Sequence, residues 1–212
     1  MTDQSTVPPD ALLLMAPGCA HCPAVLESLG RLEVINVAAH PEAAVAAGTR
    51  SVPWTRIGPF ELDGLYGPAE LAGWAGHAAA GTGMGAYLAH LLEHRQLERA
   101  VAVVRGLPGA LADLLGLAGS LETPMGIRIG ISAVVEELQD TPALRDALPA
   151  LAGLTASPEP QVRADAAHYL GLTGSDGARQ PLERLLADPD PQVREIAAES
   201  LALLTPSALR RD

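Results

Sequence analysis

The two cysteines of this 212-residue chain, Cys19 and Cys22, are separated only by Ala20 and His21. Two cysteines at this CxxC spacing either form a redox-active disulfide or supply two ligands of a metal site. A structural zinc site takes four ligands, usually from two such pairs, and the sequence holds no second pair. The spacing therefore favours redox chemistry. The alternatives are a metal or iron–sulfur cluster shared between two chains and a chemically inert pair.

The segment around the cysteines is typical of a strand followed by a turn and a helix. We expect a buried strand at residues 11–16 and a helix at residues 19–29. Cys19 would then begin the helix, where unpaired backbone N–H groups and the helix dipole stabilise a thiolate. In this arrangement Cys19 attacks a substrate disulfide, Cys22 resolves the mixed disulfide, and His21 between them further favours the thiolate.

The rest of the chain up to residue 80 alternates short apolar runs with helical stretches. Further strands are expected at residues 32–37, 52–58 and 60–67, and helices at residues 41–48 and 68–80. The order strand, helix, strand, helix, strand, strand, helix predicts an α/β domain over residues 1–80. Its first two strands are expected to be parallel and its last two to form a hairpin. The glycine-rich run at residues 81–85 predicts the end of this domain.

The sequence beyond this break is helical and repetitive. The stretch PEPQVRADAAHYLGL at residues 158–172 returns as PDPQVREIAAESLAL at residues 189–203, shifted by 31 residues. A weaker copy runs from Ile127 to Val135. Repeats of this length with two helices each predict an all-α solenoid over residues 84–212.

The repeated core P-x-V-R-x-x-A-A-x-x-L resembles that of HEAT repeats. In such repeats the proline begins a helix, and the valine and alanines pack against the neighbouring repeat. The resemblance implies that Arg163 and Arg194, which occupy the arginine position, bridge to acidic groups between repeats. It also implies a protein partner, because a solenoid presents an extended binding surface.

A second resemblance covers residues 11–80. It rests on the motif CAHCP, on SVPW at residues 51–54, and on the acidic hairpin that ends in Gly67. These features resemble the thioredoxin-like fold, closest to glutaredoxins and protein disulfide oxidoreductases. The resemblance implies that Val52-Pro53 is a cis peptide bond beside the redox pair, and that the flanking backbone binds the extended substrate peptide.

Trp54, directly after this proline, is either an ordinary core aromatic or part of the rim where a substrate docks. Three departures from thioredoxins proper are visible. Leu13 takes the position of their buried aspartate, Gly18 replaces the aromatic residue often found before the first cysteine, and the usual threonine comes one residue late, as Thr55. These departures leave the exchange chemistry intact, but the substrate range of thioredoxins is not implied. The candidate site residues are Cys19, Cys22 and His21 for catalysis, and Val52, Pro53 and Trp54 for substrate binding.

Composition limits the classes of partner. The formal net charge is −11 at pH 7 and all 14 basic residues are arginine, so the chain lacks the basic surface that nucleic acids and anionic membranes attract. No stretch approaches the roughly 20 apolar residues of a membrane span, and the first residues carry no basic leader. We therefore expect a soluble cytoplasmic protein, in whose reducing surroundings paired cysteines indicate chemistry.

Together these patterns predict a thiol–disulfide oxidoreductase that acts on a protein disulfide. The HEAT-like domain would recognise the protein partner, and a thioredoxin or glutathione system would donate electrons. No cofactor is expected beyond the redox-active Cys19–Cys22 disulfide. The alternative is a non-catalytic, redox-sensing protein-interaction scaffold.

His90 and His94, four residues apart, have a spacing that can hold zinc, but we expect them on a solvated helix face.

Overall fold

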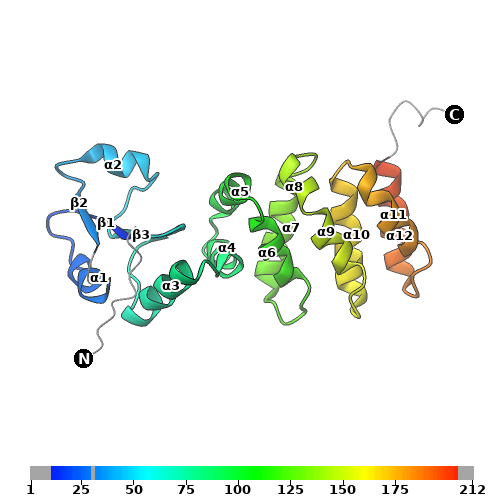
Figure 1. Ribbon diagram of the computed structural model, residues 1–212, viewed down its shortest axis with the longest axis horizontal. Coiled ribbons are helices and arrows are strands. Elements are labelled where there is room, and N and C mark those ends of the chain that lie inside the picture. Colours follow the sequence, from blue (N-terminus) through cyan, green and yellow to red (C-terminus); the bar gives the residue numbers. More distant parts are fainter. Residues whose placement is uncertain (1–10, 30–31, 205–212) are drawn as a thin grey trace. The chain divides into compact units, whose positions relative to one another are not determined.

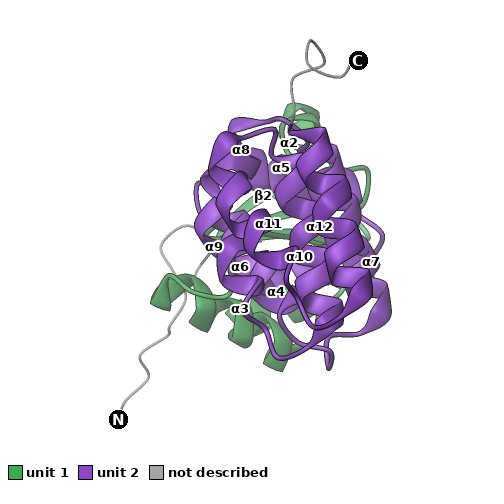
Figure 2. Ribbon diagram, turned by 90° about the vertical axis from the view of Figure 1, so that its right-hand side faces the viewer, with its two compact units in different colours: residues 1–83 green, residues 84–212 purple. Residues whose placement is uncertain are grey.

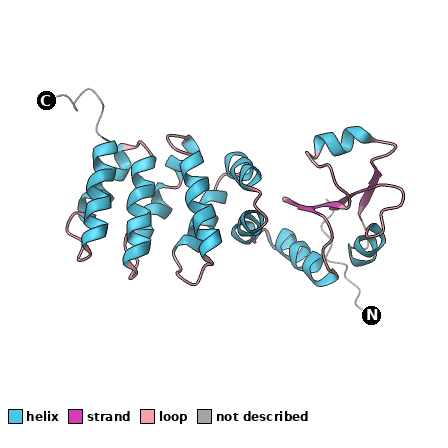
Figure 3. Cartoon of the chain, turned by 180° about the vertical axis from the view of Figure 1, so that it is seen from behind, coloured by secondary structure: helices cyan, strands magenta, loops and turns pink. Residues whose placement is uncertain are grey.

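The computed structural model describes residues 11–29 and 32–204. The chain divides into two compact units, Met1–Gly83 and Met84–Asp212, which Figure 2 shows in different colours. Among the described residues, all strands lie in the first unit, and the second unit is helical (Figure 3). The part of the chain that is described contains no helix long and apolar enough to cross a membrane.

The first unit is built on a four-stranded mixed sheet. Its strands are β1 (Ala11–Met15), β2 (Glu33–Asn36), β3 (Trp54–Ile57) and β4 (Phe60–Asp63), in the order β2-β1-β3-β4. β1 and β2 run parallel, whereas β1–β3 and β3–β4 are antiparallel. The predicted parallel first pair and final hairpin are therefore confirmed. β4 is shorter than expected, because Gly64 leaves the strand conformation at φ +96°.

Helices lie on both sides of this sheet. They are α1 (Cys22–Leu29), α2 (Pro41–Ala46) and α3 (Pro68–Ala80). α3 has the predicted bounds, because the Glu70 carboxylate accepts a hydrogen bond from the Gly67 N–H at 2.7 Å and Gly81 turns the chain at φ +63°. α1 and α3 pack against each other on one side of the sheet, and α2 lies on the other side (Figure 1).

The sheet face toward α1 and α3 forms the apolar core of the first unit. Leu13, Thr55 and Leu62 are neighbours across β1, β3 and β4, and all three are fully buried. On the same face the Phe60 ring centroid lies 5.1 Å from that of Trp74 in α3. This packing holds β1, the strand that leads into the cysteines, in the centre of the sheet.

The second unit is a series of helices (Figure 1). Its helices in chain order are α4 (Met84–Glu93), α5 (Leu97–Gly106), α6 (Ala110–Ala118), α7 (Met125–Glu137), α8 (Pro142–Asp146), α9 (Leu148–Leu154), α10 (Pro160–Leu172), α11 (Arg179–Leu185) and α12 (Pro191–Leu203). A short 3-10 turn precedes α11. The amphipathic stretch at residues 86–106 forms two helices, because Arg95 turns the chain at φ +58°. Residues 142–154 also divide in two, since Pro149 has no N–H for a bond to the Arg145 carbonyl.

The two sequence repeats form equivalent helices. α10 and α12 each begin at the proline of PQVR and run for 13 residues. The proline fits the first turn, where its missing N–H costs no helical hydrogen bond. The two helices pack closely because Gly171 has no side chain: a Cβ there would lie 2.8 Å from the Cβ of Ser200. The predicted helical repeats are confirmed.

The close approach at Gly171 gives the first testable prediction. Gly171→Ala should lower the unfolding free energy of the helical unit by about 1–2 kcal/mol, because the new methyl group forces α10 and α12 apart. Gly116→Ala is the matched control: Gly116 lies in the middle of α6, and a Cβ there meets nothing within 4 Å. That variant should instead be more stable by up to about 1 kcal/mol, through helix propensity.

Urea unfolding followed by far-ultraviolet circular dichroism measures both variants. If Gly171→Ala were as stable as the unchanged protein, the described contact between α10 and α12 would be contradicted.

Candidate functional site

The cysteine segment is a turn that carries the chain from β1 to α1. After Met15 the backbone folds back, with the Cys19 N–H donating to the Ala16 carbonyl at 3.1 Å and Gly18 at φ +81°. A positive φ of this size favours glycine, so this residue type is required at the turn. The helix begins at Cys22 and not at Cys19, which corrects the predicted bounds of residues 19–29.

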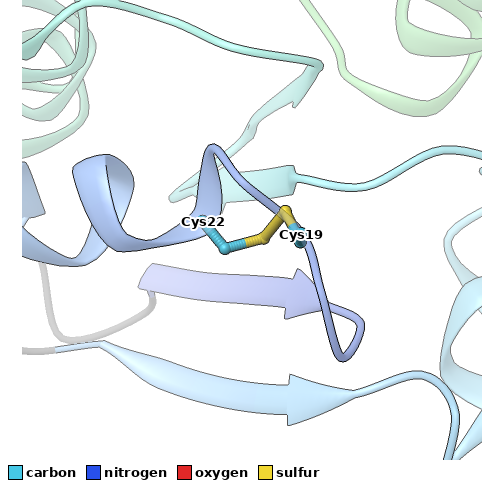
Figure 4. Close-up of a disulfide and its surroundings, with 2 residues drawn as sticks. All are labelled: Cys19 and Cys22. Carbon is cyan, nitrogen blue, oxygen red and sulfur yellow. A yellow bond between two sulfur atoms is a disulfide. The ribbon is translucent and has the colours of Figure 1, made fainter.

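Cys19 and Cys22 form a disulfide, with a Cα–Cα distance of 5.6 Å (Figure 4). Cys22 is fully buried as the first residue of α1, whereas Cys19 is half-buried in the turn before it. The Cys19 sulfur therefore lies at the N-terminal end of α1 through its bond to Cys22, although Cys19 itself is not helical. A more accessible and a buried sulfur are what an attacking and a resolving cysteine require.

His21 lies in the same turn, between the two cysteines, and is exposed. Pro23 follows Cys22 in the first turn of α1, where proline is tolerated because the first N–H groups of a helix have no helical partner. Pro23 therefore fits a helix that begins at Cys22. The imidazole is close to the pair in sequence and is open to solvent.

The pairing of the sheet brings Val52-Pro53 to the end of β1 that leads into the cysteine turn. Trp54, the first residue of β3, pairs with Leu14 near the end of β1. The peptide bond between Val52 and Pro53, directly before β3, is cis. Pro53 is buried, and its carbonyl accepts a hydrogen bond from the Gly64 N–H at 2.9 Å. This segment and the cysteine turn therefore share one end of the sheet.

The Trp54 side chain belongs to the core of the first unit. It is only 2% exposed, and its partner across the sheet, Leu14, is fully buried. Of the two expected roles, this burial supports the core aromatic. The indole Nε1 has no hydrogen-bond partner among the described residues. A substrate at this edge would meet the backbone before Trp54.

His90 and His94 lie on α4 and directly after it. Their ring centroids are 4.2 Å apart, and the His94 Nδ1 lies 2.8 Å from the His90 carbonyl oxygen, to which it donates. The described residues contain no group of three or more His, Cys, Asp or Glu side chains placed to hold a metal ion. The two imidazole rings are tilted by 39° against each other at the C-terminal end of α4.

The repeat arginines close the turns that precede their helices. Arg163 Nη1 donates to the Ser157 and Pro158 carbonyls at 2.9 and 3.0 Å, and Arg194 makes the equivalent bonds to the Asp188 and Pro189 carbonyls at 2.7 and 3.0 Å. Each arginine thus fixes the entry of the chain into its helix. This function of the motif was not visible from residue type and spacing.

The Arg163 guanidinium also reaches the next repeat. Its Nε and Nη2 donate to the two oxygens of Asp188 at 2.7 and 2.8 Å. The Arg163 side chain is 11% exposed and the Asp188 side chain 5%. The predicted bridge to an acidic group is confirmed for Arg163. For Arg194 it is corrected, because within residues 32–204 this side chain binds backbone carbonyls and forms no ion pair.

Comparison with known proteins gives one family. The sequence matches the HEAT repeats over residues 130–202, from within α7 into α12. No thioredoxin family matches the chain. A search of curated proteins finds no match. The first unit is therefore characterised by its small mixed sheet and by the disulfide at CxxC spacing.

The buried ion pair predicts acid sensitivity of the HEAT region. The pKa of Asp188 lies below its ordinary value because Arg163 donates hydrogen bonds to the carboxylate. A lowered folded-state pKa stabilises the fold above the unfolded pKa of about 4, and this contribution is lost as the pH falls through the lowered value. Asp188→Asn should lower the unfolding free energy by about 1–2 kcal/mol at pH 7, because it removes the negative charge that accepts two hydrogen bonds from the Arg163 guanidinium.

Urea unfolding at pH 7 and pH 3 measures this effect. The unfolding free energy of Asp188→Asn should fall below that of the unchanged protein at pH 7, and this difference should decrease when the pH is lowered to 3. Asp146→Asn, on an exposed aspartate of the same unit, is the control and should change the unfolding free energy by less than about 0.5 kcal/mol. An Asp188→Asn protein of unchanged stability at pH 7 would refute the stabilising role of the pair.

Proposed function

We propose that the protein is a thiol–disulfide oxidoreductase whose first unit is thioredoxin-like and whose HEAT repeats bind the protein partner. The observation that supports the proposal most directly is the Cys19–Cys22 disulfide, with a half-buried and a fully buried cysteine at one end of a β2-β1-β3-β4 sheet. The cis Val52-Pro53 bond at the same end agrees with the resemblance to thioredoxin-like folds.

The reaction begins from the reduced pair. The Cys19 thiolate attacks one sulfur of a substrate disulfide, forms a mixed disulfide with it, and releases the other substrate sulfur as a thiolate. The Cys22 thiolate then attacks the Cys19 sulfur, which forms the Cys19–Cys22 disulfide and releases the second substrate thiolate. The substrate gains two electrons and the protein loses two. A thioredoxin or glutathione system returns them, and the reverse sequence transfers the disulfide to a dithiol.

Two further groups assist these steps in the proposal. His21 is exposed beside the pair, and its protonated form stabilises the Cys19 thiolate as attacking or leaving group. The backbone of Val52 makes no hydrogen bond to another described residue, so its N–H and carbonyl are open to an extended substrate peptide. A peptide bound there would be held in the manner of an added strand.

A second candidate is a redox-sensing scaffold without turnover. The HEAT match at residues 130–202 favours it, because the family assignment concerns the region that binds partners rather than the cysteines. In this case oxidation of Cys19 and Cys22 would change the oligomeric or partner-bound state. Size-exclusion chromatography of the reduced and oxidised protein, run beside a turnover assay, separates the two candidates.

Substitution of the cysteines tests the proposed enzyme. Cys19→Ser should abolish reduction of an insulin disulfide by dithiothreitol above the uncatalysed rate, because the attacking thiolate is lost. Cys22→Ser should accumulate mixed disulfides, visible as higher bands on a non-reducing gel, because nothing resolves them. Glu27→Gln, on an exposed position of α1 outside the cysteine motif, is the control and should keep the activity, since the residues of the exchange reaction are unchanged. Full activity of Cys19→Ser would disprove the mechanism.

A further inference from the structure

The weaker copy of the repeat, in α7, differs from the copies in α10 and α12 in the partners of its arginine. Arg128 is the fourth residue of α7, as Arg163 is of α10 and Arg194 of α12. Arg163 and Arg194 brace the turns before their helices, whereas Arg128 Nη2 donates to the Asp165 carboxylate of α10 at 2.7 Å. In the described part of the chain, the Arg128 guanidinium makes no hydrogen bond to the turn before α7, in contrast to those of Arg163 and Arg194. That turn is therefore not closed by its arginine.

A hollow of about 500 Å³ lies beside the turn before α7, which the Arg128 side chain does not contact by hydrogen bonds. It is lined by the turn before α7, by the first half of α7, and by Gln161 and Asp165 of α10. Figure 1 shows the loop between α6 and α7 at the same end of the unit as the loops that precede α10 and α12. A hollow of this size is in the range of sites that bind ligands or side chains.

Apolar side chains line the hollow in a row. Met125 and Ile129 are four residues apart in α7 and therefore lie on one face of this helix. Leu121, in the turn before α7, lines the same hollow. They are 50%, 70% and 62% exposed, which is unusual for neighbouring large apolar residues. The row is not part of the repeat motif, because α10 has Pro160 and Ala164 where α7 has Met125 and Ile129.

The charge around the hollow is negative. The cation that lines it, Arg128, is paired with Asp165, whose second oxygen accepts from Gln161 at 3.0 Å. Glu122 stands at the hollow and is exposed. Residues 84–212 contain seventeen Asp and Glu against eleven Arg, so the surrounding field is also negative. A ligand complementary to this site is apolar on one side and basic at its edge.

We propose that the hollow before α7 docks a segment of a partner protein with apolar side chains four residues apart and Lys or Arg beside them. The apolar side chains of the segment contact Leu121, Met125 and Ile129, and its basic group lies near the exposed Glu122. Methionine suits such a surface because its flexible side chain adapts to the shape of the partner. The inference names the partner-binding surface of the proposed function and does not require disulfide exchange.

Selection from a random 16-residue peptide library displayed on phage, with the immobilised full chain, tests the proposal. The selected peptides should carry apolar residues at intervals of four together with Lys or Arg. Synthetic copies, measured by fluorescence polarisation, should bind Ile129→Asp at least about tenfold more weakly, as expected for loss of one buried apolar contact. Leu203→Asp is the matched control: Leu203 is 51% exposed on α12, and its replacement should leave binding unchanged.

The proposal is overturned if the peptides selected are acidic, if they bind Ile129→Asp as tightly as the unchanged protein, or if none is selected. A concentration-dependent dimer that Ile129→Asp abolishes in analytical ultracentrifugation would also overturn it, because a second copy would then cover the hollow. Failure of the proposed enzyme is distinguishable: peptide binding should persist in Cys19→Ser, and Ile129→Asp should still reduce insulin if exchange is catalysed.

Discussion

The central position of β1 in the sheet determines where the Cys19–Cys22 disulfide lies. β1 is bonded on one side to β2 and on the other to β3, and its end continues directly into the turn that holds Cys19. Because β3 is antiparallel to β1, its first residues return to this same end and bring the cis Val52-Pro53 bond with them. Without the pairing of β1 with β2 and β3, the Cys19 sulfur and the Val52-Pro53 backbone would not be held at the same end of the sheet.

The helical unit depends on a different interaction, the guanidinium of the repeat arginine. Where Arg163 and Arg194 brace the preceding turns, the chain enters its helix in a fixed way, and Arg163 further joins its repeat to Asp188 of the next. Where Arg128 reaches across to Asp165 instead, a hollow with exposed apolar residues remains. The arginine position of the motif therefore stabilises the turns before α10 and α12, whereas before α7 it leaves open the hollow that we propose for binding.

The sequence predicts much of this architecture because strands and repeats leave local patterns. The order of elements in the first unit, the bounds of α3 and the helices of the repeats follow from apolar periodicity and from proline and glycine positions. The start of α1 does not, since the turn at Gly18 depends on a backbone hydrogen bond that residue types do not reveal. Burial of Trp54 and the hollow beside Met125 also require the packed structure, because each depends on residues distant in the sequence.

A redox titration of Cys19 and Cys22 tests the central claim most directly. The protein is equilibrated in glutathione or dithiothreitol buffers of defined potential, and free thiols are detected by an alkylating reagent that shifts the band on a gel. The account predicts a reversible two-electron transition with a midpoint between about −120 and −270 mV, the range of catalytic oxidoreductases. Failure of the two cysteines to form the disulfide at any potential would contradict it.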